Sequence, residues 1–384
     1  FAILLYVTDM TNNDPISVSL ISIAEFSPIF IFSFIGGTFA DRWRPKRTMI
    51  WCDLLSAISV FVVLLTLLFG TWKAVFFATF VSAILSQFSQ PSAMKLFKVH
   101  VPEHLLQRGM AMFQTMMAIF MIIGPILGTY FYQQFGIYVS IGVMGAAFLL
   151  SALALTILPK DIVEETERKD SDFWKELQDG FRYVWSRMPL RTLGASFALA
   201  GLAVGFMQPL GIFLVIERLG QEKDFLQWLM MANGVAMLFG GGLVAGLAKQ
   251  IAPARLLAIG LLASAVSVSV VGLSTSVTLT LVFQFLNGLF FPCIHIGINT
   301  LILQSTDSQF VGRVNGVLNP LFMGMMVVTM STAGVLKSAL TLVVVYQISA
   351  VLFALAMLVL VPLFKLKNHP SGENRIQQAA EGTS

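Results

Sequence analysis

Long apolar stretches separated by short polar segments recur along the whole chain of 384 residues. A helix that crosses a membrane needs about 20 consecutive, mainly apolar residues. The apolar segment Phe1–Val7 predicts the end of a first helix whose beginning is missing. Continuous runs of this kind differ from the short alternating strands of a membrane barrel. The other predicted spans, which bring the total to twelve, cover approximately residues 16–40, 48–70, 73–94, 105–133, 136–159, 190–216, 225–248, 254–273, 277–303, 311–336 and 339–364.

Composition supports a membrane protein and excludes soluble classes. Apolar residues make up 57% of the chain and charged residues 11%, with a mean hydropathy of +0.82. In a typical soluble domain, roughly 45–50% of the residues are apolar and about 25% are charged. The net charge of +4 is too small to indicate nucleic-acid binding. Cys52 and Cys293 each lie in an apolar run, so no disulfide framework is predicted.

The distribution of basic residues predicts the orientation. Cytoplasmic loops of membrane proteins are enriched in Lys and Arg. If the middle loop and both termini are cytoplasmic, all but four of the 24 Lys and Arg lie on that side. The four exceptions are Lys73, Arg218, Lys223 and Lys337.

The middle loop predicts four regions in the chain. They are an N-terminal six-helix bundle at 1–159, a linker at 160–189, a C-terminal six-helix bundle at 190–365 and a disordered cytoplasmic tail at 366–384. Within the linker, a stripe of apolar residues predicts an amphipathic helix. Such a helix could lie on the inner membrane face or pack on the protein's own cytoplasmic surface. The stripe consists of Phe173, Trp174, Leu177, Phe181, Val184, Trp185 and Met188.

The segment between the second and third spans carries a motif. It reads Gly36-Gly37-Thr38-Phe39-Ala40-Asp41-Arg42-Trp43-Arg44-Pro45-Lys46-Arg47. This pattern of a Gly, three residues, Asp-Arg and a basic cluster resembles the signature of the major facilitator superfamily. Its Asp-Arg-Trp variant resembles the drug:proton antiporters that include macrolide and enterobactin exporters. The resemblance implies an all-α integral membrane fold of twelve transmembrane helices in two pseudo-symmetric bundles, placed in a bacterial plasma membrane.

The motif predicts a cytoplasmic gate. Asp41 lies at the C-terminal end of its helix, where the helix dipole disfavours an anion. It therefore needs a partner, which could be Arg42, Lys46 or the start of the span at 311–336. The resemblance implies that this contact joins the halves in the outward-facing state. The alternative is that the basic cluster only anchors the topology. The gate motif comprises Gly37, Asp41, Arg42, Lys46 and Arg47.

A second short pattern lies in the fifth span. Gly124-Pro125-Ile126-Leu127-Gly128 resembles the core of the antiporter motif. Gly and Pro together permit a kink and close packing, so we predict a hinge at Gly124, Pro125 and Gly128. An ordinary kink of a membrane helix is the alternative.

Ionisable groups within spans are candidates for function because burying them is costly. Glu25 lies sixteen residues before Asp41, about 24 Å along one helix. It is a candidate proton carrier, or alternatively a solvated residue of the outer vestibule. Asp53 is a second candidate for proton coupling, although its position favours pairing with the basic cluster at Arg47.

Other polar residues within spans could line a substrate cavity or join helices by hydrogen bonds. We predict no metal site, cofactor or enzymatic activity, because ligand clusters, nucleophile signatures and phosphate loops are lacking in the sequence. A proton gradient would therefore supply the energy. The cavity candidates are Gln114, Gln208, Asn233, Asn287 and His295.

Together these features predict a secondary transporter that exports an amphipathic, drug-like or macrolide-like compound by proton antiport and alternating access. The 33 Phe and 19 Met favour an apolar ligand. We expect a monomer that contacts the lipid bilayer and a small substrate, but no nucleic acid. The alternatives are a lysolipid or nutrient transporter (an importer, flippase or uncoupled facilitator) and a non-transporting receptor or scaffold.

Overall fold

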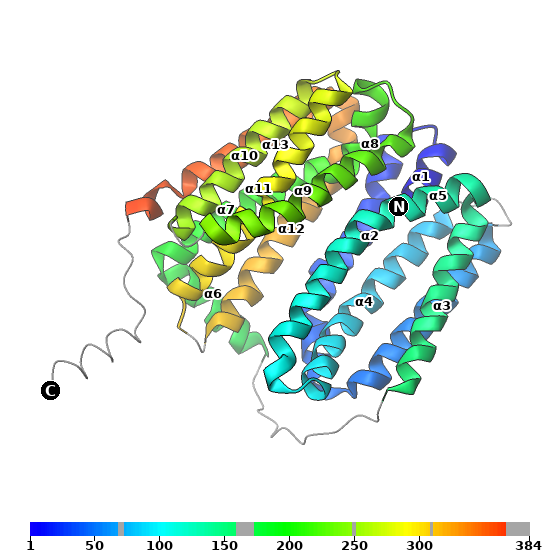
Figure 1. Cartoon of the computed structure of the whole chain (residues 1–384), viewed down its shortest axis with the longest axis horizontal. Helices are drawn as coiled ribbons and strands as arrows, with labels where there is room; N and C mark the ends of the chain where they lie inside the picture. Colours follow the sequence, from blue (N-terminus) through cyan, green and yellow to red (C-terminus); the bar gives the residue numbers. More distant parts are fainter. Residues whose placement is uncertain (68–72, 159–172, 248–250, 308–309, 366–384) are drawn as a thin grey trace.

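The computed structural model describes residues 1–67, 73–158, 173–247, 251–307 and 310–365, and long helices make up most of these ranges (Figure 1). The first half of the chain contains α1 (Ala2–Met10), α2 (Pro15–Arg42), α3 (Pro45–Leu67), α4 (Lys73–His100) and α5 (Glu103–Ile157). Helix α6 (Phe173–Ser186) follows. The second half contains α7 (Met188–Met207), α8 (Gly211–Phe213), α9 (Leu226–Leu247), α10 (Pro253–Leu273), α11 (Val277–Ser305), α12 (Val311–Ala339) and α13 (Leu342–Val359).

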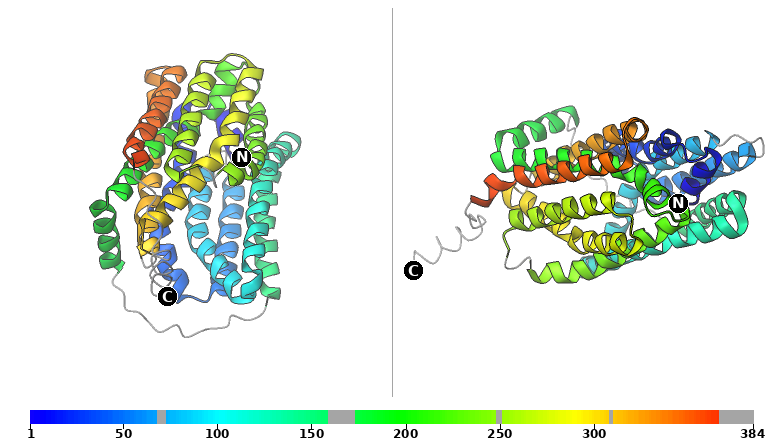
Figure 2. Two further views of the ribbon diagram at one scale, coloured as in Figure 1. Left: turned by 60° about the vertical axis from the view of Figure 1, so that its left-hand side comes forward. Right: turned by 90° about the horizontal axis from the view of Figure 1, so that it is seen from above.

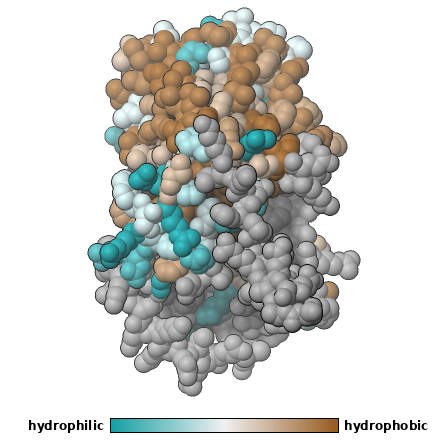
Figure 3. Space-filling view, turned by 90° about the vertical axis from the view of Figure 1, so that its left-hand side faces the viewer, coloured by the Kyte–Doolittle hydropathy of each residue, from teal (hydrophilic) through white to brown (hydrophobic). Residues whose placement is uncertain are grey.

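The helices run along a common direction, as the two views in Figure 2 show. We call the end of the molecule where α2 stops and α3 starts the linker end, because α6 lies there as well (Figure 1). The opposite end, where α1 stops and α2 starts, is the far end. On the face drawn in Figure 3, apolar side chains cover the part toward the far end, and hydrophilic side chains gather toward the linker end.

The predicted order of spans is confirmed. Ten helices of the described residues are long and apolar enough to cross a membrane. Helix α5 contains two predicted spans, because the backbone reverses at Gly136, which has a φ of 76° and a ψ of −177°. Glycine adopts this conformation without a steric penalty. The short α1 takes the place of the first predicted span.

The predicted span at 190–216 lies within Met188–Arg218, which is long and apolar enough to cross a membrane. This stretch is not one regular helix. After α7, the chain forms a 3₁₀ turn at Gln208–Leu210, the short α8 and a π-helix at Leu214–Arg218. Pro209 lies within this stretch and lacks the N–H group that a continuous helix would use. A further 3₁₀ turn, Lys223–Phe225, leads into α9.

Close packing of helices in the second half depends on small residues. A Cβ atom on Gly201 would lie 2.4 Å from the carbonyl oxygen of Phe322, and one on Gly205 would lie 2.2 Å from that of Met326. Helices α7 and α12 therefore cross at backbone contact, an arrangement that glycine permits in membrane helices. Leu5 and Val18 of the first half belong to the same apolar core as the second half.

Helix α6 packs on the protein and also presents an apolar face to the surroundings. The Tyr183 ring stacks on Phe310 at 4.4 Å, and a Cβ on Gly180 would lie 2.9 Å from the carbonyl oxygen of Arg313. Phe181 and Trp185 stack on each other but stay 57% and 62% exposed. The two predicted roles of the amphipathic helix are therefore compatible. Phe173, Trp174 and Leu177 lie outside the residues whose side chains are described.

Polar contacts join the end of α6 to Asp307, which lies between α11 and α12. Asp307 accepts hydrogen bonds from the Arg187 guanidinium at 2.7 Å and from the Tyr183 hydroxyl at 2.9 Å. The backbone N–H of Asp307 donates to the same hydroxyl at 3.0 Å. Partial burial raises the pKa of Tyr183, which further favours the protonated hydroxyl. The predicted boundaries at 159, 189 and 365 remain predictions, and the tail at 366–384 lies outside the described residues.

Candidate functional site

The two halves meet through glycines of the second half. A Cβ on Gly334 of α12 would lie 2.5 Å from the carbonyl oxygen of Pro15 in α2, and one on Gly324 would lie 2.7 Å from the Phe30 ring. On the other side, a Cβ on Gly234 of α9 would lie 2.8 Å from Ile122 of α5. Helix α12 is therefore the neighbour of α2 across the interface, and α9 is the neighbour of α5.

Polar side chains join the halves at the far end. Asp9, at the end of α1, forms an ion pair with Lys223, which precedes α9. The same carboxylate oxygen accepts a hydrogen bond of 2.5 Å from the Tyr132 hydroxyl in α5. Beside this pair, Gln133 donates a hydrogen bond to Asp224. Both the ion pair and the Gln133–Asp224 bond connect residues of the first half with residues of the second.

Glu25 lies in the middle of α2. It is ten residues from the start of the helix at Pro15, about 15 Å along the axis. Its side chain is exposed. An exposed carboxyl group halfway along a span can exchange a proton wherever water reaches it.

Asp53 is linked to another helix of its own half. The Ser151 hydroxyl of α5 donates a hydrogen bond of 2.6 Å to the Asp53 carboxylate. This bond connects α3 with the second pass of α5. The structure therefore gives Asp53 a polar partner other than the basic cluster that the sequence suggested.

Two residues of the predicted gate motif have described side chains. The Lys46 ammonium donates hydrogen bonds to the carbonyl oxygens of Thr156 at 2.9 Å and Leu158 at 2.5 Å. These carbonyls belong to the end of α5, where a cation is favourable. Arg47 is exposed. Gly37, Asp41 and Arg42 lie outside the residues whose side chains are described, although the backbone of α2 is helical through Arg42.

The predicted hinge in α5 has one tight contact. A Cβ on Gly128 would lie 3.1 Å from Phe1 Cβ, so α1 approaches α5 closely there. Gly124 has no such neighbour within 4 Å. The Thr129 hydroxyl donates a hydrogen bond of 2.9 Å to the carbonyl oxygen of Pro125 itself.

The cavity candidates separate into two groups. Asn233 donates a hydrogen bond of 3.1 Å to the carbonyl oxygen of Gln284, and Asn287 accepts one of 2.9 Å from Ser264. These bonds join α11 to α9 and α10, which is the helix-joining role that the sequence left open. Gln208 and His295 are exposed, and His295 contacts Phe291 edge-on at 4.9 Å. The Gln114 side chain is not described.

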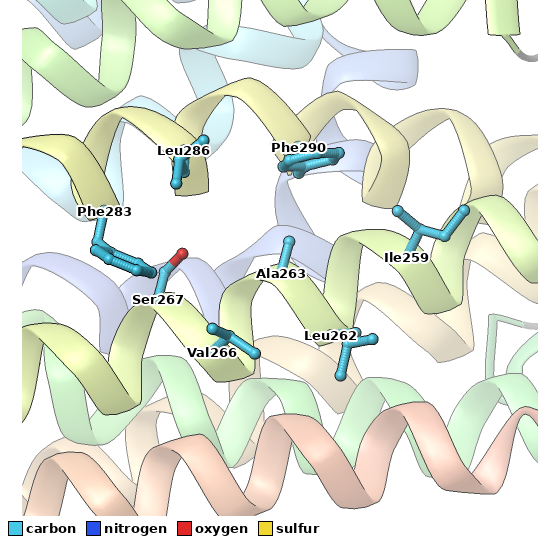
Figure 4. A pocket seen from close by; sticks show the side chains of 8 residues that line it. All are labelled: Ile259, Leu262, Ala263, Val266, Ser267, Phe283, Leu286 and Phe290. Atoms are coloured by element: carbon cyan, nitrogen blue, oxygen red, sulfur yellow. The ribbon is translucent and has the colours of Figure 1, made fainter.

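A shallow hollow of about 280 Å³ lies between α10 and α11 (Figure 4). Its lining is apolar apart from the Ser267 hydroxyl, and none of the sequence-predicted site residues belongs to it. The residues that face it are Ile259, Leu262, Ala263, Val266, Ser267, Phe283, Leu286 and Phe290.

The sequence did not single out the far-end contacts of Asp9, Tyr132 and Lys223. Lys223 is one of the few basic residues outside the predicted cytoplasmic loops, which was the available signal. No periodicity relates residues that are 214 positions apart, so their pairing required the structure.

These features define a multi-pass α-helical membrane protein whose halves meet along α2, α12, α5 and α9. The profile of the Major Facilitator Superfamily matches residues 1–223 and 211–383. The chain therefore belongs to the Major Facilitator Superfamily, a family of membrane transporters rather than enzymes.

Several relatives of the chain are bacterial efflux proteins. The chain is 25% identical over 323 residues to the multidrug efflux pump Tap of Mycolicibacterium fortuitum, which covers 81% of this chain and 78% of that protein. It is 26% identical over 184 residues to macrolide efflux protein A of Streptococcus pyogenes, covering 47% and 45%. These similarities agree with the drug:proton antiporter branch that the Asp-Arg-Trp motif indicated.

Solved structures confirm the fold. The nucleoside transporter NupG superposes with a TM-score of 0.72 at 12% identity, over 95% of each chain. The human organic anion transporter MFSD10 gives a TM-score of 0.64 at 16% identity, over 90% of this chain and 84% of that one. At such identities the similarity concerns the fold alone.

Proposed function

We propose that this protein exports an amphipathic, drug-like or macrolide-like compound by proton antiport. Glu25 is the observation that carries the proposal, because its exposed carboxyl group lies halfway along a span. Such a group is costly in a membrane and is best explained by a function. The names of the relatives support efflux as the direction and a drug or macrolide as the substrate class.

The proposed orientation places the linker end in the cytoplasm. Lys46 and Arg47 lie at this end, as do Arg187 and Arg313. Lys73 and Lys223 lie at the far end, which would face outward. The excess of Lys and Arg at the linker end supports this assignment under the positive-inside rule.

The substrate would be reached from either side in turn. Closure of the linker end would use Asp41 and Arg42 of α2 with the start of α12, and Gly128 with Pro125 would let α5 bend. The close approach of α2 to Gly324 and Gly334 supports α12 as the partner element. The exposed Gln208 and His295 are the remaining candidates for polar contacts with substrate.

Transport into inverted membrane vesicles tests the proposal. An imposed proton gradient, acidic inside, should drive accumulation of a fluorescent cationic dye and of a macrolide. Glu25→Gln should reduce this accumulation at least tenfold, because the amide cannot carry a proton. Glu222→Gln changes an exposed carboxylate of the loop before α9 and is the matched control; it should keep most of the accumulation.

Two results would change the proposal. If Glu25→Gln accumulates the probes as the control does, proton transfer occurs elsewhere, with Asp53 as the next candidate. If no amphipathic probe accumulates in the native protein, export of this substrate class is wrong, and a lysolipid or nutrient transporter becomes the better description.

A further inference from the structure

One ion pair and one hydrogen bond of a neutral amide connect the two halves at the far end. The first half contributes Asp9, and the second half contributes Lys223. Of the two side chains, Lys223 is 24% exposed and Asp9 is 44% exposed, so the pair is partly shielded from solvent. The Lys223 ammonium group also lies 5.2 Å from the centre of the Tyr132 ring, within the range of a cation–π contact.

Tyr132 connects this pair to α5. Its hydroxyl donates to the same Asp9 oxygen that Lys223 binds, so one carboxylate gathers α1, α5 and the segment before α9. The adjacent Gln133–Asp224 hydrogen bond also connects α5 with the segment before α9. Partly exposed polar pairs are individually weak, and such contacts can therefore be made and broken repeatedly.

The residues on the second-half side follow an irregular segment. The π-helix at Leu214–Arg218 and the preceding 3₁₀ turn interrupt the regular hydrogen bonding of the span. Gly220 then has a φ of +60°, a conformation that suits glycine. A stretch with mixed helical types often marks a functional hinge. Lys223 and Asp224 thus lie beyond a segment that can change shape without unfolding α7 or α9.

From these contacts we infer that Asp9, Tyr132 and Lys223, with Gln133 and Asp224, form a latch that holds the far end closed. Release of the latch, with movement at Gln208–Gly220, lets the halves separate there. The inference rests on the proposed function in that transport requires the far end to open. The latch assigns a role in the transport cycle to residues outside the cytoplasmic signature.

Ser19 provides a reporter of opening. It is 3% exposed, and its hydroxyl oxygen would lie 2.8 Å from a Cβ on Gly334, so it is covered by the opposite half. In a protein whose Cys52 and Cys293 are replaced by alanine, Ser19→Cys introduces one thiol. A membrane-impermeant maleimide applied from the far side should label this thiol slowly.

Charge reversal then tests the latch. Asp9→Lys and Lys223→Asp should each raise the labelling rate at least fivefold, and the two changes together should restore the slow rate. The milder Asp9→Asn and Lys223→Gln should act in the same direction if a reversal impairs folding. Lys73→Asp, at an exposed lysine of the same end, is the control and should leave the rate unchanged.

Equal labelling rates in Asp9→Asn, Lys223→Gln and Lys73→Asp would overturn the latch, as would fast labelling in a folded double reversal. The labelling requires neither substrate nor a proton gradient. A protein that fails to accumulate dye but follows the predicted labelling pattern would retain the latch and lose the exporter assignment. Normal dye export with no change in the labelling rate would retain the exporter assignment and overturn the latch.

Discussion

At the scale of single residues, the glycines of α12 show how the same residue type serves different purposes. A Cβ on Gly334 would meet backbone of α2 at 2.5 Å, whereas one on Gly316 would meet nothing within 4 Å. The first glycine permits contact between the halves, and the second occupies an open position of the helix. Alanine has the higher helix propensity, by roughly 1 kcal/mol.

Alanine substitutions at these two positions should therefore have opposite effects. Gly334→Ala should lower the melting temperature, because overpacking costs about 1–3 kcal/mol. Gly316→Ala should leave it unchanged or raise it. Thermal unfolding of the purified variants, followed by the fluorescence of a thiol-reactive dye, measures both. A lower melting temperature for Gly316→Ala than for Gly334→Ala would contradict the packing described for α2 and α12.

Asp14 is a second residue with a definable energetic role, because it caps α2. Its carboxylate accepts hydrogen bonds from the backbone N–H of Ser17 at 3.0 Å and from the Ser17 hydroxyl at 2.6 Å. Partial burial acts to raise the pKa of Asp14, but these bonds and the charge of Lys337 outweigh it and lower the pKa below its ordinary value of 3.8. The charged form is thus favoured in the folded protein.

The cap should stabilise the protein in a pH-dependent way. Because folding lowers the pKa, the stabilisation is complete above pH 3.8 and is lost as the pH falls through the lower native value. Asp14→Ala should cost about 0.5–2 kcal/mol at pH 7, while Asp14→Asn should retain most of the cap. Melting temperatures at pH 7 and pH 3 check this. An equal deficit of Asp14→Ala at both pH values would exclude the charged cap.

At the scale of helices, Lys46 connects the signature segment to the end of α5. Its two hydrogen bonds to the carbonyls of Thr156 and Leu158 satisfy acceptors that lack partners within the helix. A residue that belongs to the predicted gate motif thus has a structural contact within its own half.

Lys46→Gln should consequently loosen the last turn of α5. Removing a cation from a helix C-terminus costs about 0.3–1 kcal/mol, so amide hydrogen exchange over residues 153–158 should become about two- to fivefold faster. Arg47→Gln, at an exposed neighbour, should leave this exchange unchanged. If the two variants exchange alike in this segment, the contact does not stabilise α5.

The sequence predicted elements better than contacts. Hydrophobic runs are local, so the order of spans and the break between 133 and 136 could be placed without a structure. The irregular end of α7 could not, because 3₁₀ and π turns share the apolar composition of a regular helix. Asn233 and Asn287 remained ambiguous for another reason. The sequence around an amide within a span is the same whether the amide faces a cavity or bonds a neighbouring helix.

At the scale of the whole molecule, polar contacts occur at both ends of the two halves and differ in kind. At the far end, Asp9 and Lys223 connect one half to the other. At the linker end, Arg187 and Tyr183 hold α6 to Asp307, which lies between α11 and α12 in the second half. The linker helix is thus attached to the half that follows it. Movement of the first half relative to the second can occur without detaching α6.

We propose proton antiport, in which substrate and protons move in opposite directions through this molecule. Purified protein in liposomes, loaded with a pH-sensitive dye and with no initial pH gradient, tests it directly. An outward gradient of a transported macrolide should acidify the liposome interior, and Glu25→Gln should abolish that acidification. Movement of the macrolide with no change in internal pH would contradict proton antiport.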